Sequence, residues 1–259
     1  LAAQPERHVA ASAIVGLVND PRDSLLSSAV SARVPFVDIT RWTPRIAAAV
    51  ARIALAGTHS PVVLASGWMA GLVARTAALL AKAVGGQLDA IESSVRYALA
   101  DASGADSVDY IDRLWIPFDA TQDGAPITVL PLRDARRVQI AGHRTTVRRI
   151  DTPDQWSLPL TLGARSATLR LGFDSAIAGA GLAFITRLGF FRWFASERFR
   201  GLRHAVLRGR EDDSHPGASA AFSVDVSNTA GTRCGMSLSK ADGQAALTAV
   251  GAWLAVRFA

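Results

Sequence analysis

The stretch Ala13-Ile-Val-Gly-Leu-Val-Asn19 is a short apolar run, and it decides the fold class of this chain together with two similar runs downstream. These are Val34-Pro-Phe-Val-Asp-Ile-Thr40 and Pro61-Val-Val-Leu-Ala65. Residues 23–32 and 44–56 lie between the three runs and carry apolar side chains at helical spacing. Apolar strands that alternate with helices are typical of a parallel sheet with both faces covered. The first part of the chain therefore predicts an α/β fold.

Residues that begin or end helices mark the boundaries in this part. Asp20 and Pro21 suit the start of the first helix, because an aspartate caps free N–H groups and the first helical turn tolerates proline. The loop Gly67-Trp-Met-Ala-Gly71 follows the third strand. An alanine-rich helix over residues 70–84 comes next, and Gly85-Gly86 is expected to end it.

The sequence pattern changes after this helix. Residues 89–99 alternate between apolar and polar, as a strand with one covered face does. Asp123-Gly124 is a hairpin signal, although the segment around it looks longer than the two-residue ideal. Residues 220–228 and 233–238 predict a second hairpin, and residues 175–206 predict one or two helices. Antiparallel strands mixed with helices indicate an α+β domain.

We therefore expect two domains in the 259 residues, of which 49% are hydrophobic and 19% charged. Residues 1–84, joined by a C-terminal helix over 241–259, form half of a nucleotide-binding-type domain with a parallel sheet. Residues 85–240 form the α+β domain, with a mixed or antiparallel sheet.

The net charge of +6 raises the question of nucleic-acid binding. All but two of the 28 basic residues are arginines, and the densest groups lie at 133–149 and 187–210. Neither group contains a recognisable nucleic-acid-binding module. We expect arginines on solvated faces and no nucleic-acid partner.

Cysteine and histidine usage excludes two further classes. Cys234 has no cysteine partner, which excludes an internal disulfide and favours a reducing, cytoplasmic compartment. The five histidines lack metal-ligand spacing, so no metal is expected. The run Leu182-Ala-Phe-Ile-Thr-Arg-Leu-Gly-Phe-Phe-Arg-Trp-Phe194 resembles an interfacial helix that would bring the protein to membranes or lipids. Packing of this run on the second-domain sheet or in a dimer interface is the favoured interpretation.

Several short segments of the sequence resemble those of the saccharopine dehydrogenase-like family of oxidoreductases, in its bacterial form. They are Val15-Gly-Leu-Val-Asn-Asp20, Val34-Pro-Phe-Val-Asp-Ile-Thr40, Gly67-Trp-Met-Ala-Gly71, Tyr110-Ile-Asp-Arg113, Asp151-Thr-Pro-Asp154 and Ala249-Val-Gly-Ala252. The resemblance implies an NAD(P)-dependent enzyme with the C-terminal half of a Rossmann-type sheet, a mixed substrate domain, a small-molecule substrate and a homodimer. Some relatives act on amino-acid conjugates and others are linked to lipid enoyl reduction.

In a fold of that kind, ligands lie beyond the carboxyl ends of the parallel strands. The resemblance therefore implies cofactor contacts from Asn19 and Asp20, and catalytic roles for Asp38 and Thr40. Asn19 would reach the ribose or the nicotinamide amide, and Asp38 would orient the substrate or relay a proton. The competing interpretation is that Asn19 and Asp20 only cap a helix.

The third strand end contributes Gly67 and Trp68 as cofactor-binding candidates. Glycine there allows backbone amides to approach a bound group. The competing interpretation is that Gly67 serves the turn alone and that Trp68 packs in the core.

The chain departs from the family at the phosphate-binding turn, since no G-x-G-x-x-G sequence precedes Ala13. Gly179-Ala-Gly-Leu-Ala-Phe184 lies inside an apolar helical run and is interpreted as a packing segment. Nothing in the sequence selects NAD or NADP. Three functions remain: an oxidoreductase whose loop lies upstream, a non-catalytic binding or dimerisation module that has lost cofactor binding, and a membrane-associated enoyl-reductase-like protein.

Overall fold

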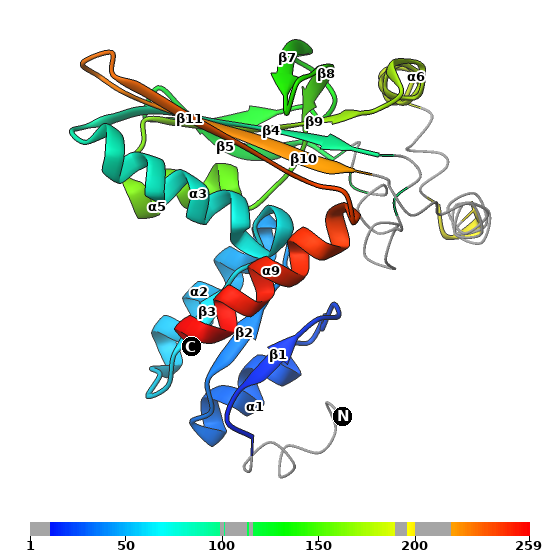
Figure 1. Cartoon of the computed structure of the whole chain (residues 1–259). Coiled ribbons are helices and arrows are strands. Elements are labelled where there is room, and N and C mark those ends of the chain that lie inside the picture. Colours follow the sequence, from blue (N-terminus) through cyan, green and yellow to red (C-terminus); the bar gives the residue numbers. More distant parts are fainter. Residues whose placement is uncertain (1–10, 99–100, 102–112, 114–115, 190–195, 200–218) are drawn as a thin grey trace.

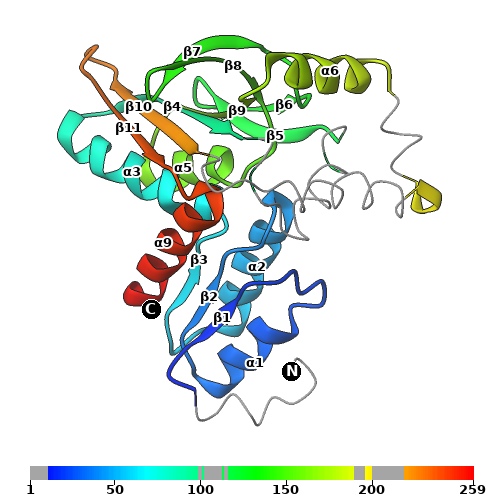
Figure 2. The same ribbon diagram turned by 45° about the vertical axis from the view of Figure 1, so that its right-hand side comes forward.

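The structure is a computed structural model that describes residues 11–98, 101, 113, 116–189, 196–199 and 219–259. It is a mixed α/β protein with a small parallel sheet, a larger curled mixed sheet and a two-stranded hairpin (Figure 1). The two larger sheets lie in different parts of the molecule, and helices occupy the space between them (Figure 2).

The parallel sheet has the strand order β1-β2-β3, which follows the chain. Its elements are β1 (Ile14–Gly16), α1 (Ser24–Ala32), β2 (Phe36–Asp38), α2 (Thr43–Ala56) and β3 (Val62–Leu64). Val37 of β2 pairs in register with Val15 on one side and with Val63 on the other. The α/β fold predicted from the three apolar runs is confirmed for this part, and the strands are shorter than the runs.

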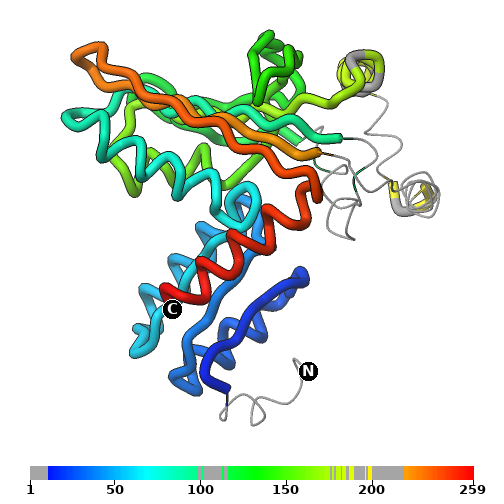
Figure 3. The backbone as a smooth tube through the Cα atoms, in the orientation of Figure 1, coloured from blue at the N-terminus to red at the C-terminus, as the bar shows by residue number. Residues whose placement is uncertain are grey.

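Helices cover both faces of the parallel sheet. Ile14 and Phe36 pack against Leu26 of α1 and Ala49 of α2, so both crossover helices lie on one face. On the other face Val37 packs against Ala255 of the C-terminal helix α9 (Gly243–Phe258). The chain thus leaves this region through α3 (Trp68–Val84) and returns to it through α9 (Figure 3).

The mixed sheet has the strand order β11-β10-β4-β9-β8-β7. Only the pair β4–β9 is parallel. The strands and the helix between β8 and β9 are β4 (Leu88–Tyr97), β7 (Arg136–Ile140), β8 (His143–Arg149), α5 (Asp154–Leu162), β9 (Ser166–Phe173), β10 (Ala220–Asn228) and β11 (Arg233–Lys240). Helices α3 and α5 cover its apolar face, where Val73, Leu158, Ile91, Leu169 and Val224 form one buried cluster.

The opposite face of this sheet carries polar residues such as Glu92, Ser94 and Arg170. The hairpin β7–β8 curls over part of it and buries a small apolar cluster of Ile140, Val147 and Ala221. A Cβ atom at Gly172 of β9 would lie 2.6 Å from the carbonyl oxygen of Thr146 of β8, so only glycine allows this crossing. The hairpin reaches as far as β11, where the Ala141 N–H donates to Ser237 Oγ at 3.1 Å. The hairpin can therefore curl this close to β9 only because residue 172 is glycine, which has no side chain.

A two-stranded hairpin, β5 (Phe118–Gln122) and β6 (Ala125–Val129), lies beside α5 and β9. Its strands are joined by Asp123 and Gly124 alone, both with positive φ, as a two-residue hairpin turn requires. The hairpin signal is confirmed, and the expectation of a longer loop is wrong.

The helical prediction over 175–206 is met by α6 (Ala176–Arg187) and by the short 3-10 helix η2 (Glu197–Phe199). Residues 190–195 and 200–206 of that prediction lie outside the described residues. Gly179, in the segment interpreted as packing, is buried against Phe173 of β9, and Gly181 is exposed.

The first turn of α3 is left-handed. Met69, Ala70 and Gly71 have φ values of 53°, 53° and 75°, where the sequence suggested a plain glycine loop. Left-handed backbone is unfavourable for residues with a Cβ atom, so packing must hold this turn. Helix α9 supplies that packing, because a Cβ atom at Gly251 would lie 2.1 Å from the Met69 carbonyl oxygen.

We expect the substitution Gly251→Ala to destabilise the protein by about 2 kcal/mol or more, because overpacking against backbone outweighs the higher helix propensity of alanine. Urea unfolding measures the change. Gly181→Ala is the matched control, since a Cβ atom there meets nothing within 4 Å. Equal stability of the two variants would contradict the close contact between α9 and the left-handed turn.

Candidate functional site

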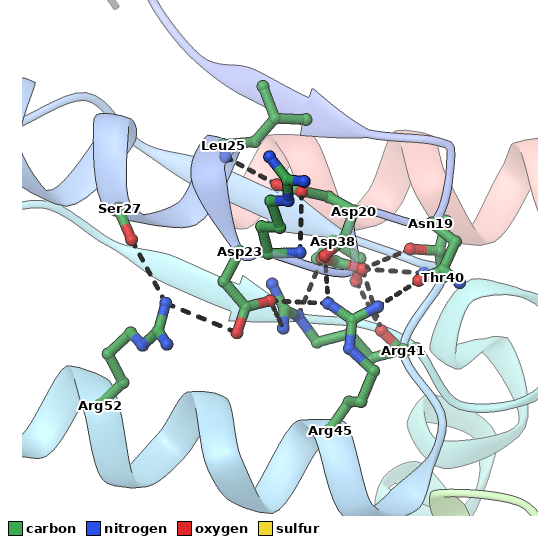
Figure 4. A network of polar contacts seen from close by, with 12 residues as sticks. Asn19, Asp20, Asp23, Leu25, Ser27, Asp38, Thr40, Arg41, Arg45 and Arg52 are labelled. Atoms are coloured by element: carbon green, nitrogen blue, oxygen red, sulfur yellow. Dashed lines mark hydrogen bonds and ion pairs between the residues drawn. The ribbon is translucent and has the colours of Figure 1, made fainter. Parts of the chain in front are cut away.

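The carboxyl edge of the parallel sheet brings together four of the predicted site residues (Figure 4). Asp38 ends β2, and its Oδ1 accepts hydrogen bonds from the Thr40 N–H at 2.8 Å and from the Thr40 hydroxyl at 3.1 Å. The Thr40 hydroxyl also lies 3.4 Å from the carbonyl oxygen of Val18, beyond β1. Asp38 and Thr40 therefore form one turn that connects the first two strand ends.

A buried arginine completes the Asp38 environment. Arg41 is 2% exposed, its Nε lies 2.9 Å from Asp38 Oδ2, and one of its terminal nitrogens donates to Asp23 Oδ1 at 2.5 Å. Asp23 comes from the segment after β1, so the guanidinium joins the ends of β1 and β2. A buried guanidinium with two carboxylate partners is tightly constrained, because removing one partner would leave an uncompensated charge away from water.

Arg45, in the first turn of α2, extends this network. It donates to Asn19 Oδ1 and to the Asp20 carbonyl oxygen, and it lies 2.7 Å from Asp23 Oδ1. Arg52 adds an outer contact to Asp23 at 3.7 Å. We call Asp23, Asp38, Arg41 and Arg45 the edge network (Figure 4).

The edge network changes the ionisation of its most connected carboxylate. Burial is the largest single influence on Asp23 and raises its pKa, but the hydrogen bonds and charges of Arg41 and Arg45 together outweigh burial, so the pKa is lowered below 3.8. The carboxylate is therefore ionised wherever the protein is folded near neutral pH.

Asp20 has a local role at the start of α1. Its Oδ2 accepts a hydrogen bond from the Leu25 N–H at 2.7 Å. Asp20 therefore satisfies a free N–H in the first turn, but the N-cap of α1 is Asp23, so the expected helix start at Asp20 and Pro21 is wrong. Asn19 is exposed and contributes its side-chain oxygen to Arg45.

Gly67 and Trp68 lie beyond β3, next to Asp154 at the start of α5, a residue for which the sequence predicted no role. The Trp68 N–H donates to Asp154 Oδ2 at 2.7 Å. A Cβ atom at position 67 would lie 2.4 Å from Asp154 Oδ1, so this contact requires glycine. Ser66 links the pair to the edge network, since its hydroxyl donates to the Asp38 carbonyl oxygen at 3.1 Å.

Asp154 is a buried carboxyl group whose pKa is raised. It is 1% exposed, and its Oδ1 has no hydrogen-bond partner among the described residues. Burial raises its pKa from 3.8 to about 6, and the N–H groups of Trp68 and of Asp154 itself offset this only in part. Nearby, Asp151 accepts a hydrogen bond from the Thr43 hydroxyl at 2.7 Å, and burial likewise raises its pKa. Residues 151–154 thus contact the start of α2 and the start of α3.

Asp23, Arg41 and Arg45 are partners of the predicted site that the sequence did not indicate. One signal was available: two arginines four residues apart, Arg41 and Arg45, flank the start of the expected helix shortly after Asp38. Asp154 stands in the word Asp151-Thr-Pro-Asp154, but its partner Trp68 is 86 residues away, and no local pattern predicts that contact.

Two negative findings apply to the described part of the chain. It contains no group of three or more His, Cys, Asp and Glu side chains arranged to hold a metal ion. In the same residues, every helix is too short or too polar to cross a membrane.

No protein-family model matches this sequence, and no curated protein sequence matches it to a significant degree. The resemblance to saccharopine dehydrogenase-like enzymes stays a prediction, as do the roles assigned to Asn19, Asp20, Asp38, Thr40, Gly67 and Trp68.

The substitution Asp154→Asn is expected to make stability less dependent on pH. Folding raises the pKa of Asp154 from 3.8 to about 6, so the neutral carboxyl group stabilises the fold below pH 3.8 and this contribution is lost as the pH rises through 6. The variant keeps the neutral form, and above pH 6 it should exceed the wild type by up to about 3 kcal/mol. Urea unfolding as a function of pH tests this. Asp242→Asn, at a site with 70% side-chain exposure, is the control; a gain for Asp154→Asn that is the same at every pH would contradict the account.

Removal of the Asp23 carboxylate should cost about 3 kcal/mol, because Arg41 then stays buried with a single partner. The measurement is the urea unfolding free energy of Asp23→Ala. Arg52→Ala removes an outer member of the same cluster whose side chain is 50% exposed, and it should cost less than about 1 kcal/mol. Similar losses of unfolding free energy in both variants would show that the buried Asp23–Arg41 contact contributes no more to stability than the exposed Arg52 contact.

Proposed function

We propose that this chain belongs to an NAD(P)-dependent oxidoreductase of the saccharopine dehydrogenase-like kind, and that the carboxyl edge of its parallel sheet receives the nicotinamide end of the cofactor. The observation that carries the proposal is the parallel strand order β1-β2-β3 with both crossover helices on one face. One mononucleotide-binding half of a Rossmann fold has this arrangement, and its ligands lie beyond the carboxyl ends of the strands.

The residues at this edge suit a nicotinamide ring better than phosphate groups. Leu17 and Val18 follow β1 and are exposed apolar side chains, which favours contact with a flat aromatic ring. Asn19 is exposed beside them. Its side-chain oxygen accepts a hydrogen bond from Arg45, so its amide N–H groups are oriented as donors for the carboxamide of the nicotinamide. The sequence has no G-x-G-x-x-G turn that would hold a pyrophosphate.

When bound, the nicotinamide supplies or accepts the hydride. The side chains of this chain orient the reactants and control protons. Asp38 already forms an ion pair with Arg41 and accepts hydrogen bonds from Thr40 and Ser66, so its part is to fix the loops after β1 and β2. Asp154 lies beside Gly67, and its pKa of about 6 suits it to exchange a proton with a reacting group. NAD and NADP both fit this half, and the substrate is a small molecule or a lipid-linked group.

A second function, a non-catalytic binding or dimerisation module, is favoured by one observation. The carboxylates of Asp23 and Asp38 are paired with arginines of the same chain, so the edge is electrostatically complete without a ligand. Under this alternative the edge is a structural joint, and no nicotinamide binds.

Titration with reduced nicotinamide mononucleotide and with NADPH tests the proposal. Trp68 and Trp42 lie near the edge, and energy transfer from tryptophan to the dihydronicotinamide reports binding. We expect the two ligands to bind with dissociation constants within about threefold of each other, because this half has no site for the adenosine phosphate. Asn19→Ala should weaken both about tenfold, and Gln139→Ala, in the second domain, neither.

Tighter binding of NADPH by about hundredfold would contradict the half-site, because it requires a complete dinucleotide site. Absence of energy transfer with either ligand, in a protein whose urea unfolding is cooperative, would support the non-catalytic module instead.

A further inference from the structure

Helix α6 presents an apolar stripe to solvent. Ile177, Phe184 and Leu188 are 87%, 63% and 61% exposed. Their spacing, with the exposed Gly181 between them, is four, three and four residues, which places them in one line along the helix. Large apolar side chains that are exposed singly need no explanation, but a line of them on one helix indicates an interaction surface.

The opposite side of α6 is attached to the protein by small residues. Gly179 and Ala183 are buried, and a Cβ atom at Gly179 would lie 3.5 Å from the Phe173 ring of β9 and 3.6 Å from the guanidinium of Arg148. The helix therefore lies along β8 and β9 (Figure 2), with Gly179 and Ala183 buried and Ile177, Phe184 and Leu188 exposed. Residues 190–194 of the run that was expected to pack lie outside the described residues.

Positive charge accompanies this stripe. Residues 187–210 contain seven arginines and one acidic residue, while the remainder of the chain has 21 basic and 21 acidic residues. The entire net charge of the protein therefore lies in this part of its sequence, and the three acidic residues at 211–213 leave the wider segment positive. Arg187 and Arg198, the two described arginines of this group, are both exposed.

We propose that the Ile177–Phe184–Leu188 stripe of α6 binds the surface of a membrane rich in anionic lipids, with Arg187 directed to the headgroups. An exposed apolar line on a helix that also carries an exposed arginine is the arrangement of a helix that lies in a membrane interface. A second copy of the chain fits less well, because three side chains bury far less than the ~1,600 Å² of a typical stable interface. The proposal is independent of the nicotinamide site, which lies on the other sheet.

Co-sedimentation with vesicles tests the proposal on the whole chain. The wild type should bind vesicles of phosphatidylcholine and phosphatidylglycerol, bind pure phosphatidylcholine vesicles more weakly, and lose affinity as salt increases. The triple variant Ile177→Ser, Phe184→Ser, Leu188→Ser should lose about tenfold or more in partition coefficient. Arg187→Gln should lose about fivefold on anionic vesicles only.

The matched control is the triple variant Leu55→Ser, Leu79→Ser, Leu160→Ser, which removes three equally exposed leucines from α2, α3 and α5. It should bind as the wild type does, and all variants should keep the wild-type urea midpoint. Equal vesicle binding by the two triple variants would overturn the proposal, as would equal wild-type binding to neutral and anionic vesicles. A wild-type dimer that the α6 triple variant converts to a monomer, without vesicle binding, would assign the stripe to a second copy and also overturn it.

Discussion

The buried guanidinium of Arg41 is the contact on which the candidate site depends. It joins Asp23, from the segment after β1, to Asp38, at the end of β2. Without it two carboxylates would face each other in a region with little access to water, and burial would oppose their charge. With it, the loops after both strands are fixed to each other through one planar group.

The rest of the edge is built outward from that contact. Ser66 ties the end of β3 to Asp38, and Trp68 then ties α3 to Asp154 of the second domain. A left-handed first turn of α3 lies directly beside these contacts, held by the close approach of Gly251. These contacts join the ends of all three strands, and Leu17, Val18 and Asn19 are exposed at the end of β1.

The sequence predicted those features that depend on local patterns. The three strands, α1, α2 and the hairpin at Asp123-Gly124 all follow from apolar periodicity and turn residues. It did not predict β7, whose residues are mostly polar, or α5, a nine-residue helix with Pro159 inside it. The left-handed turn at Met69 and Ala70 was also missed, because residues with a Cβ atom adopt that backbone only under tertiary constraint.

The candidate site was predicted as a place and not as a set of contacts. Strand ends located Asn19, Asp38 and Gly67 correctly at one edge, since parallel strands bring their carboxyl ends together. The partners that define their chemistry lie on other elements, and only the folded chain brings them close. Asp154 is the clearest case, because burial raises its pKa, and no sequence pattern around residue 154 indicates that burial.

Amide chemical-shift mapping by NMR with reduced nicotinamide mononucleotide tests the central claim most directly, because it locates the ligand residue by residue. The account predicts that the largest shifts fall on residues 17–19 and 66–68, at the carboxyl edge of the parallel sheet, with little change on the polar face of the mixed sheet. Shifts concentrated on the mixed sheet, with the carboxyl edge unchanged, would contradict it.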